Sequence, residues 1–492
     1  MEKIDTLILG AGFAGLGMGA QLSRAGRSDF LILEKAKSVG GTWRENTYPG
    51  AACDTETHIY CYSFALNLGV SRMYAGQEEL LAYAHKLVKD FGLEKNLRFN
   101  AEVEAARWNE DNQRWIITLT DGNQISARVF IPAWGQLNRP QIPEFEGRDS
   151  FAGVQFHSAT WSHDTELEGK RIASIGNAAS AVQYIPYLAQ VAGQLNVFQR
   201  SPNWILPRNQ QIFTEEELAE FAADPSLFEA SRREIHETRE AQFSRTRTGS
   251  EEAEEIAALA IAHVVNQVED EALREKLIPD FPVACKRVLR ADEYYPTLNR
   301  ENVELTTEGI SRIVPEGVIT TDGTLHEADV IIYGTGFHAQ AFQGPIEITG
   351  RDGADLRQKW ADGPEAYLGI TVSGFPNMFL LYGPNTNLGH NSIISMLEIQ
   401  QNYVISALET IDGMDQNAID VAENKFRAFC DQVQDDMAAS AWVGSCRSWY
   451  KNASGRVVNN WSGTVNEYRE ITGEFRIEDY EILPQAAVLE GV

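Results

Sequence analysis

The sequence predicts an α/β protein with two Rossmann-like dinucleotide-binding domains and a helical insertion in the second. Three observations predict this fold. The apolar run Ile4–Leu9 leads through Gly10-Ala-Gly12-Phe-Ala-Gly15 into a segment of small residues typical of a helix. The same order of strand, small-residue turn and helix returns at Arg171–Ile175 and Gly176–Ala181. From Thr214 to about Glu275 the composition changes to Glu, Ala, Arg and Leu with helical periodicity.

Composition and charge restrict the class of protein. With 492 residues, 43% of them apolar, the chain is long enough for two or three domains with ordinary hydrophobic cores. Its 42 basic and 70 acidic residues give a formal net charge of -28. Such a charge repels phosphate backbones and anionic lipid surfaces, so neither nucleic acid nor a membrane is an expected partner. No stretch approaches the ~20 consecutive apolar residues of a membrane-spanning helix, and we expect a soluble protein.

The cysteines and the N-terminus favour a cytoplasmic location. The five cysteines contain no C-x-x-C pair, so the sequence predicts no disulfide framework, zinc ribbon or dithiol redox centre. They are Cys53, Cys61, Cys285, Cys430 and Cys446. The nine histidines are scattered, and no metal site is expected. The N-terminus is acidic and its apolar run ends at Gly10, which is not the pattern of a secretory signal.

Both domains are expected to be discontinuous. The buried strand Val330–Tyr333 leads into Gly334-Thr335-Gly336-Phe337, after which the chain should complete the first domain. The expected divisions are residues 1–145 and 331–492 for the first domain, 146–212 and 279–330 for the second, and 213–278 for the helical insertion.

The first domain should begin with a βαβ unit followed by a β-meander. A second buried strand, Phe30–Leu33, ends at Glu34 and completes the βαβ order. Alternating apolar residues then predict three further strands at 102–109, 115–120 and 124–130. The meander is therefore expected to be inserted into the first domain.

The glycines of the first unit predict a dinucleotide site. Gly10 allows a tight turn, Gly12 lets the backbone approach a diphosphate, and Gly15 permits close packing of the helix on the strand. The helix then faces the phosphates with the positive end of its dipole. Glu34 lies where a carboxylate accepts hydrogen bonds from the 2′-hydroxyl of an adenosine ribose. These residues alone leave NAD and FAD as alternatives.

The second unit predicts a different dinucleotide. In Gly176-Asn177-Ala178-Ala179-Ser180-Ala181, alanine replaces the middle and the last glycine, and Ala178 adds a methyl group where a diphosphate approaches. The strand that follows ends in Gln199-Arg200-Ser201 and not in an acid. A cation and a hydroxyl suit a 2′-phosphate, which a carboxylate would repel, so NADPH is favoured over NADH.

The segment between the two units carries a recognisable pattern. From Phe151 through His157 to Trp161 it reads F-x-G-x-x-x-H-x-x-x-W. This pattern resembles the linker signature of the Baeyer–Villiger monooxygenases, flavoproteins that insert one oxygen atom of O2 next to a ketone carbonyl. A second signature of that family, G-G-x-W-x-x-x-x-Y-P-G-x-x-x-D, is matched in full between Gly40 and Asp54. Trp161 favours this family over related N- and S-oxygenases, which usually lack a tryptophan there.

The resemblance implies FAD at the first site and NADPH at the second. The residues it assigns to FAD are Gly10, Gly12, Phe13, Gly15, Glu34, Gly41, Thr42, Trp43, Asp54, Tyr60, Asn385 and Asn391. Those it assigns to NADPH are His157, Gly176, Asn177, Ser180, Ala181, Arg200, Ser201, Lys286, Arg287 and Trp449. For Trp449, a position in the hydrophobic core is an equally good interpretation. His157 and Trp161 are expected to hold the linker against both domains more than to touch substrate.

Arg287 and Asp54 are the predicted catalytic residues. The segment Cys285-Lys286-Arg287 resembles the one that carries the family's active-site arginine. The resemblance implies that Arg287 stabilises a peroxide and a developing oxyanion, and that Asp54 orients Arg287 and keeps it charged. The implied reaction converts ketones to esters or lactones with NADPH and O2 through a C4a-peroxyflavin.

Two alternatives stay open at this point. A related flavin enzyme could oxidise sulfides or amines, and a nucleotide-binding protein could have kept both folds without turnover. The preferred ketone and the oligomeric state are not predicted by any motif in the sequence.

Overall fold

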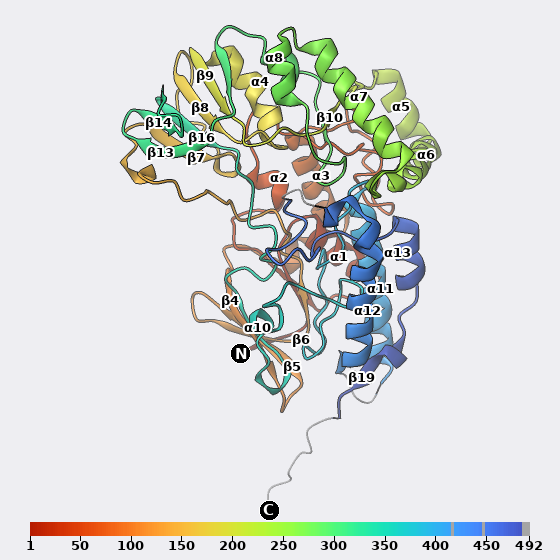
Figure 1. Cartoon of the computed structure of the whole chain (residues 1–492). Coiled ribbons are helices and arrows are strands. Elements are labelled where there is room, and N and C mark those ends of the chain that lie inside the picture. The colour runs from red at the N-terminus through yellow and green to blue at the C-terminus, as the bar shows by residue number, and fades with distance from the viewer. Residues whose placement is uncertain (415–417, 445–447, 485–492) are drawn as a thin grey trace, which may run out of the picture.

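Two sheets organise the chain, for which the computed structural model describes residues 1–414, 418–444 and 448–484. A seven-stranded sheet consists, in spatial order, of β17 (Glu347–Thr349), β4 (Val103–Asn109), β5 (Arg114–Leu119), β6 (Gln124–Pro132), β1 (Glu2–Leu9), β2 (Phe30–Leu33) and β3 (Leu97–Arg98). A five-stranded sheet consists of β12 (Val303–Thr306), β9 (Gln194–Phe198), β8 (Arg171–Ile175), β16 (Val330–Tyr333) and β7 (Val154–His157). The two sheets lie in separate lobes (Figure 1). The predicted α/β class with two dinucleotide-binding units is confirmed.

The first sheet joins the opening βαβ unit to the meander. β1 lies parallel to both β2 and β6, with Leu9 opposite Leu33 on one side and Pro132 on the other. The helix α1 (Phe13–Arg24) connects β1 to β2 and is buried along almost its whole length. β4, β5 and β6 pair antiparallel, and β17 adds to the edge at β4. The meander therefore extends the nucleotide-binding sheet itself.

The second sheet is entirely parallel. β8 pairs with β9 and β16, and β16 also pairs with β7. The helix α4 (Ala181–Val191) follows β8 in the manner of α1 after β1. Because β16 is hydrogen-bonded on both sides within this sheet, the boundary expected between residues 330 and 331 is wrong. It falls inside a strand, and the second domain extends at least to Tyr333.

The chain after β16 returns to the first domain. The long helix α11 (Ile393–Asp412) packs against α1, and Gln401 Nε2 donates to the carbonyl of Ala14 at 3.2 Å. The remaining elements are α2 (Thr42–Glu45), α3 (Gln77–Asp90), β10 (Ile205–Leu206), β11 (Leu289–Arg290), α9 (Tyr294–Thr297), β13 (Ile310–Val314), β14 (Gly317–Thr320), β15 (Leu325–Glu327), α10 (Leu356–Lys359), β18 (Ile419–Val421), α12 (Glu423–Asp436), α13 (Val465–Thr472) and β19 (Tyr480–Ile482). Within the described part of the chain, no helix has the length and apolar character needed to cross a membrane.

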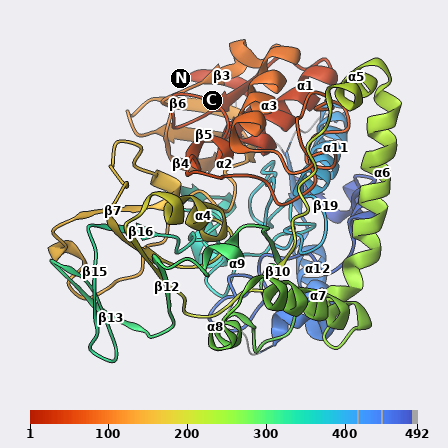
Figure 2. The same cartoon turned by 90° about the horizontal axis from the view of Figure 1, so that it is seen from above.

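The helical insertion contacts both domains. It consists of α5 (Glu215–Ala223), α6 (Pro225–Ala241), α7 (Glu251–Gln267) and α8 (Glu271–Leu277). Phe228 of α6 is fully buried in the core of the first domain. Val264 of α7 and Leu277 of α8 belong to the core of the second domain. Leu218 and Phe221 of α5 also pack against the core of the first domain. In Figure 2, α7 lies beside β10 and α9. The insertion was expected in the second domain, and it contacts the cores of both domains.

Candidate functional site

The glycine-rich turn of the first unit, from Gly10 to Gly15, forms a concave surface made of backbone atoms. Gly10 has φ +109°, and a Cβ there would lie 2.8 Å from the carbonyl oxygen of Ala133. A Cβ on Gly15 would lie 1.9 Å from the oxygen of Gly10, and one on Gly41 would lie 2.9 Å from the Cα of Gly12. α1 has no side-chain cap and no acid in its first turn. Its free N–H groups and this glycine surface fit the diphosphate of a dinucleotide.

Glu34 is fixed at the end of β2. Its side chain accepts hydrogen bonds from the backbone N–H groups of Ala11 at 3.0 Å and Ala36 at 2.9 Å. Arg44 Nη1 approaches the same carboxylate at 3.3 Å, a contact that the sequence analysis did not predict. With only 5% of its surface exposed, Glu34 presents a buried acceptor beside the fingerprint turn. This placement fits an adenosine ribose.

Three aromatic side chains predicted for the flavin come together. The ring of Tyr60 lies 5.9 Å from that of Phe13 and 5.9 Å from that of Trp43, measured between centroids. Burial raises the pKa of Tyr60 well above its ordinary value, so its hydroxyl stays protonated. Thr42 begins the short helix α2 that carries Trp43. These side chains form an apolar wall suitable for a flat ring system.

The turn of the second unit, which begins at Gly176, has the same backbone conformation but is more exposed to solvent. Gly176 has φ +109°, and a Cβ there would lie 2.4 Å from the carbonyl oxygen of Gly334. Asn177 Nδ2 donates to Gln199 Oε1 at 2.7 Å and to the backbone oxygen of Ser201 at 3.0 Å. The first turn of α4 has neither a side-chain cap nor an acid. Ala178 is exposed, while Ala181 is buried in the helix.

The residues predicted for a 2′-phosphate form a cluster. Lys286 Nζ donates to Ser201 Oγ at 2.7 Å and lies 4.3 Å from the ring centroid of Phe281. Burial lowers the pKa of Lys286, and the charge of Arg200 lowers it further. Two cations that repel each other beside a hydroxyl favour an anionic ligand between them. Lys286 comes from a segment 85 residues beyond Ser201, so the fold assembles this cluster.

Asp54 and Arg287 form a two-point ion pair between the domains. Arg287 Nε donates to Asp54 Oδ2 at 3.1 Å, and Nη2 donates to Oδ1. Burial alone would raise the pKa of Asp54, but Arg287 holds it below its ordinary value. Asp54 in turn raises the pKa of Arg287. Both groups are therefore charged, and the Arg287 side chain is still 37% exposed.

The buried Tyr450 and the partly buried Tyr382 lie beside this pair, and the sequence analysis missed both as site residues. Burial raises the pKa of Tyr450 to about 12 and also raises the pKa of Tyr382. The charge of Arg287 opposes the rise in both tyrosines. Tyr382 has φ +59°, a backbone conformation uncommon outside glycine, and its hydroxyl donates to Asn387 Oδ1 at 2.8 Å. No sequence motif marks the strained backbone of Tyr382. Tyr450 was visible only as a neighbour of Trp449.

The two asparagines predicted for the flavin use their amides within the protein. Asn385 Nδ2 donates to the carbonyl oxygens of Val457 at 2.9 Å and Asn460 at 3.0 Å. Asn391 Nδ2 donates to Glu240 Oε1 at 2.8 Å, on the insertion helix α6. Asn391 Oδ1 accepts from the backbone of Ser392. These contacts give both side chains a structural role and do not support the flavin assignment.

The linker residue Trp161 lies between the two domains. The ring of Trp161 lies 6.5 Å from that of Tyr48 in the first domain and 5.5 Å from that of Tyr184 in the second. His157 is buried, and its Nδ1 accepts from the backbone N–H of Ala159 at 3.1 Å. The contacts of Trp161 agree with a linker held against both domains.

Trp449 contacts Tyr450, which lies beside the Asp54–Arg287 pair. Its ring centroid is 4.6 Å from that of Tyr450, and its carbonyl oxygen accepts from Gln340 Nε2 at 3.1 Å and Asn459 Nδ2 at 2.6 Å. The side chain is half-buried. Its assignment to NADPH stays a prediction.

The cysteines differ from expectation at one position. Cys285 is disulfide-bonded, so the expectation that the cysteines form no disulfide is wrong there. Cys53, Cys61 and Cys430 are free and buried. In residues 1–414, 418–444 and 448–484, no three His, Cys, Asp or Glu side chains are grouped as metal ligands.

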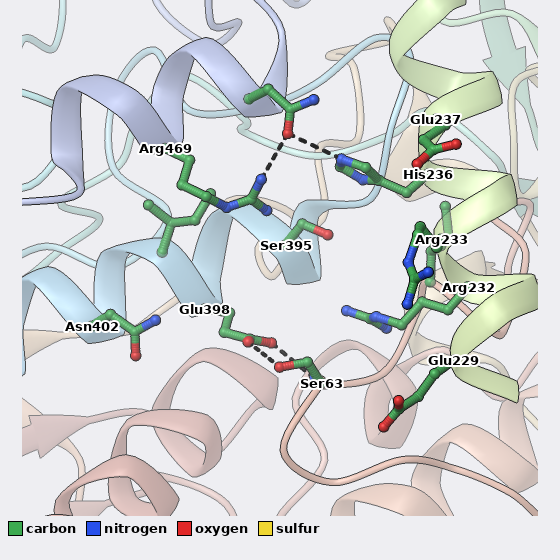
Figure 3. A pocket seen from close by; sticks show the side chains of 13 residues that line it. Ser63, Glu229, Arg232, Arg233, His236, Glu237, Ser395, Glu398, Asn402 and Arg469 are labelled. Carbon is green, nitrogen blue, oxygen red and sulfur yellow. Dashed lines mark hydrogen bonds between the residues drawn. The ribbon is translucent and has the colours of Figure 1, made fainter. Parts of the chain in front are cut away.

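A separate pocket of about 430 Å³ lies between α6, α11 and α13 (Figure 3). Its lining combines three arginines, Arg232, Arg233 and Arg469, with Glu229, Glu237 and Glu398. Opposite charges thus balance around it. It contains none of the residues predicted for the nucleotides or for catalysis.

Comparison with known proteins agrees with this geometry. A family profile described as pyridine nucleotide-disulphide oxidoreductase matches residues 7–259. A "Baeyer-Villiger monooxygenase" of Streptomyces coelicolor is 38% identical over 492 residues, which is 100% of this chain and 95% of that protein. Another protein of that name, from Pseudomonas aeruginosa, is 38% identical over 96% of this chain and 90% of its own length. An "Oxidized steroid monooxygenase bound to NADP" is 31% identical, with a TM-score of 0.88, covering 98% of this chain and 99% of that one.

Proposed function

Because this chain belongs to the family of Baeyer–Villiger monooxygenases, we propose that it converts ketones to esters or lactones with NADPH and O2. FAD is assigned to the cradle around Gly10, Gly12 and Glu34, and NADPH to the unit that begins at Gly176. The bare backbone turns, the two uncapped helices and the aromatic wall support this assignment. Bound FAD, once reduced by NADPH, supplies the activated oxygen.

The observation that carries the proposal is the Asp54–Arg287 pair. Asp54 belongs to the first domain and Arg287 to the second, so the pair lies where the two nucleotide units meet. Asp54 engages Nε and Nη2, and no acceptor among the described residues is hydrogen-bonded to Nη1. This edge can donate to a carbonyl oxygen as negative charge develops on it. A preorganised donor of this kind contributes about 3–4 kcal/mol to transition-state stabilisation.

The choice of coenzyme follows from the cations of the second unit. Arg200 and Lys286 repel each other, and a 2′-phosphate between them would remove that repulsion. The hydroxyl of Ser201, already bonded to Lys286, adds a donor to the same group. NADH lacks this phosphate and gains none of these contacts.

The test is a product screen with purified protein, NADPH and air. Cyclic, aromatic and linear ketones are offered beside thioethers, and products are identified by gas chromatography. Esters or lactones formed in step with NADPH oxidation are expected from at least one ketone class. Sulfoxides as the only products would move the chain to the sulfide-oxidising alternative. A yellow protein whose flavin is not bleached by anaerobic NADPH would be a nucleotide-binding protein without turnover.

Cofactor identity is tested separately. Heat release followed by chromatography should yield FAD, since the first unit provides both a diphosphate cradle and a ribose acceptor in Glu34. FMN in its place would overturn the assignment of this unit.

A further inference from the structure

A glutamine of the second domain holds a loop of the first domain by three hydrogen bonds. Gln183 is the third residue of α4. Its Oε1 accepts from the hydroxyl of Tyr48 at 3.0 Å and from the backbone N–H of Ala52 at 3.3 Å. Its Nε2 donates to the carbonyl oxygen of Ala52 at 3.0 Å. One side chain therefore satisfies both backbone groups of Ala52 across the domain boundary.

The loop is shaped to receive this helix. Gly50 has φ +80°, and a Cβ there would lie 2.7 Å from the backbone oxygen of Gln183. The ring of Tyr48 lies 5.9 Å from that of Tyr184, one residue further along α4. The loop Tyr48-Pro49-Gly50 thus forms a contact surface for the first turn of α4. A side chain at Gly50 would lift the loop from the helix.

The same loop leads directly into the catalytic pair. Ala52 lies two residues before Asp54, and Cys53 between them donates its N–H to the carbonyl of Ala75 at 3.0 Å. The position of Asp54 is thereby tied to Gln183 on one side and to its own domain on the other. The hydroxyl of Tyr48 is also hydrogen-bonded to Ser180 at the start of α4, a contact that opposes the rise of its pKa by burial to about 12.

We infer that Gln183 is a positioning residue that keeps the Asp54–Arg287 pair in register with the coenzyme-binding turn of α4. The inference rests on the proposed function, because it takes that turn as the site of the NADPH diphosphate. A coenzyme that orders the first turn of α4 then orders Ala52 and Asp54 through the Gln183 amide. Without the amide, Asp54 and Arg287 still meet, but their place relative to the coenzyme is less fixed.

The experiment uses the complete FAD-loaded enzyme and four variants. Gln183→Leu removes the donor and the acceptor at similar size, and Gln183→Glu keeps only the acceptor. Tyr48→Phe removes the bonds of the hydroxyl to Gln183 and Ser180 and leaves both bonds of Gln183 to Ala52. The matched control is Gln155→Leu: Gln155 also accepts from a tyrosine, Tyr333, at 2.8 Å and donates to a backbone carbonyl, but within the second domain.

The first measurement is the product formed per NADPH oxidised. Gln183→Leu should lower this ratio about tenfold, with hydrogen peroxide making up the difference, because small displacements of a catalytic group cost large factors in rate. The KM for NADPH and the FAD content should stay within about twofold of the wild type. Gln183→Glu should fall between, and Tyr48→Phe and Gln155→Leu should resemble the wild type. Unchanged coupling in Gln183→Leu overturns the inference, and loss of FAD from both Gln183 variants makes the residue merely structural.

The second measurement does not depend on turnover. Hydrogen exchange of peptides covering residues 50–56 should slow when NADP+ is added to the wild type and should not respond in Gln183→Leu. An equal response in both proteins overturns the inference. If no ketone is oxidised by the wild type, the proposed function fails, while the exchange data still decide whether Gln183 links α4 to Asp54.

Discussion

The two dinucleotide units have the same turn and different surroundings. Gly10 and Gly176 have the same φ of +109°, and in each a Cβ would strike a backbone carbonyl oxygen. The first unit then ends at the buried carboxylate of Glu34, whereas the second ends at the exposed Arg200. The turn is dictated by backbone sterics and is common to both. We propose that the charge at the end of the following strand separates the two units, because the carboxylate of Glu34 suits a ribose 2′-hydroxyl whereas the cation of Arg200 suits a 2′-phosphate.

The strongest way to break this comparison is to remove the residue that lies between the units. Arg287→Ala should lower ester formation by about 100-fold or more, because a preorganised donor to developing negative charge is lost. Reduction of the flavin by NADPH should continue, with O2 diverted to hydrogen peroxide. Stopped-flow flavin absorbance beside product analysis separates the two half-reactions. Since Asp54 holds the pKa of Arg287 above its ordinary value, alkaline pH should not reproduce the defect in the wild type.

Arg287→Lys sharpens the same point. A compact ammonium cannot bridge Asp54 and an oxyanion as the planar guanidinium does, so activity should not return. Undiminished ketone oxygenation in Arg287→Ala would falsify the catalytic assignment. A loss confined to flavin reduction would assign Arg287 to the coenzyme alone.

The second unit is tested by removing its exposed cation. Arg200→Ala should raise the KM for NADPH about tenfold or more and leave the KM for NADH nearly unchanged, since a charge-assisted hydrogen bond to phosphate is worth about 1.5–3 kcal/mol. Arg300→Ala is the control, because Arg300 is an exposed arginine of the same domain whose side chain donates to the nearby Asn302. Equal effects on both coenzymes would place the 2′-phosphate elsewhere.

The pKa of Lys286 predicts how the KM for NADPH depends on pH, in the wild type and in Arg200→Ala. Burial and the charge of Arg200 both lower the pKa of Lys286, so its cation is lost at a lower pH than that of an ordinary lysine. The KM for NADPH should therefore rise on the alkaline side. In Arg200→Ala this rise should move to higher pH, because one of the two causes of the lowered pKa is gone. An unmoved profile would show that Lys286 does not sense Arg200.

Local patterns explain why much of this comparison could be predicted from the sequence. Strand, glycines and helix follow one another within about twenty-five residues in each unit, and sterics at Gly10 and Gly176 leave few alternatives. The pairing of Asp54 with Arg287, 233 residues apart, followed from the family resemblance, because no local pattern contains it. Lys286 was assigned to NADPH by the resemblance and Ser201 by the end of its strand, and their mutual contact was not predicted.

Other features depend on contacts that leave no local signal. Phe228 and Val264 lie on consecutive helices of the insertion, yet they enter different cores. β16 reads as a buried strand in either domain, and only its pairing with β7 and β8 assigns it to the second. Gln183 is an ordinary helical residue until the fold brings Ala52 against it. Asn391 was assigned to the flavin by the resemblance, but its amide donates to Glu240 of the insertion helix α6, 151 residues earlier in the chain.

The first unit is tested through its acid. Glu34→Gln should weaken FAD retention about tenfold, because a charged acceptor becomes neutral and Arg44 loses its buried partner. Flavin absorbance after extensive dialysis gives the retained fraction. The control is Glu45→Gln, since Glu45 pairs with the same arginine but is exposed. Equal losses in the two variants would assign the effect to Arg44 and not to the ribose acceptor.

The smallest expected effect concerns the methyl group of Ala178, one of the differences between the two turns. Ala178 occupies the position that Gly12 holds in the first unit, and it is exposed at the uncapped start of α4. Ala178→Gly should lower the KM for NADPH about twofold to threefold by letting the diphosphate approach the backbone. The same change should cost about 0.5–1 kcal/mol of stability, because glycine loses more conformational freedom on folding. Steady-state kinetics and thermal unfolding measure the two effects.

Since a Cβ at Gly12 would lie 3.6 Å from the Cα of Gly41, Gly12→Ala should fold and yet retain less FAD. Ala178→Gly could leave NADPH binding unchanged while Gly12→Ala still releases FAD. That result would show that NADPH does not approach the backbone at α4 as FAD approaches it at α1.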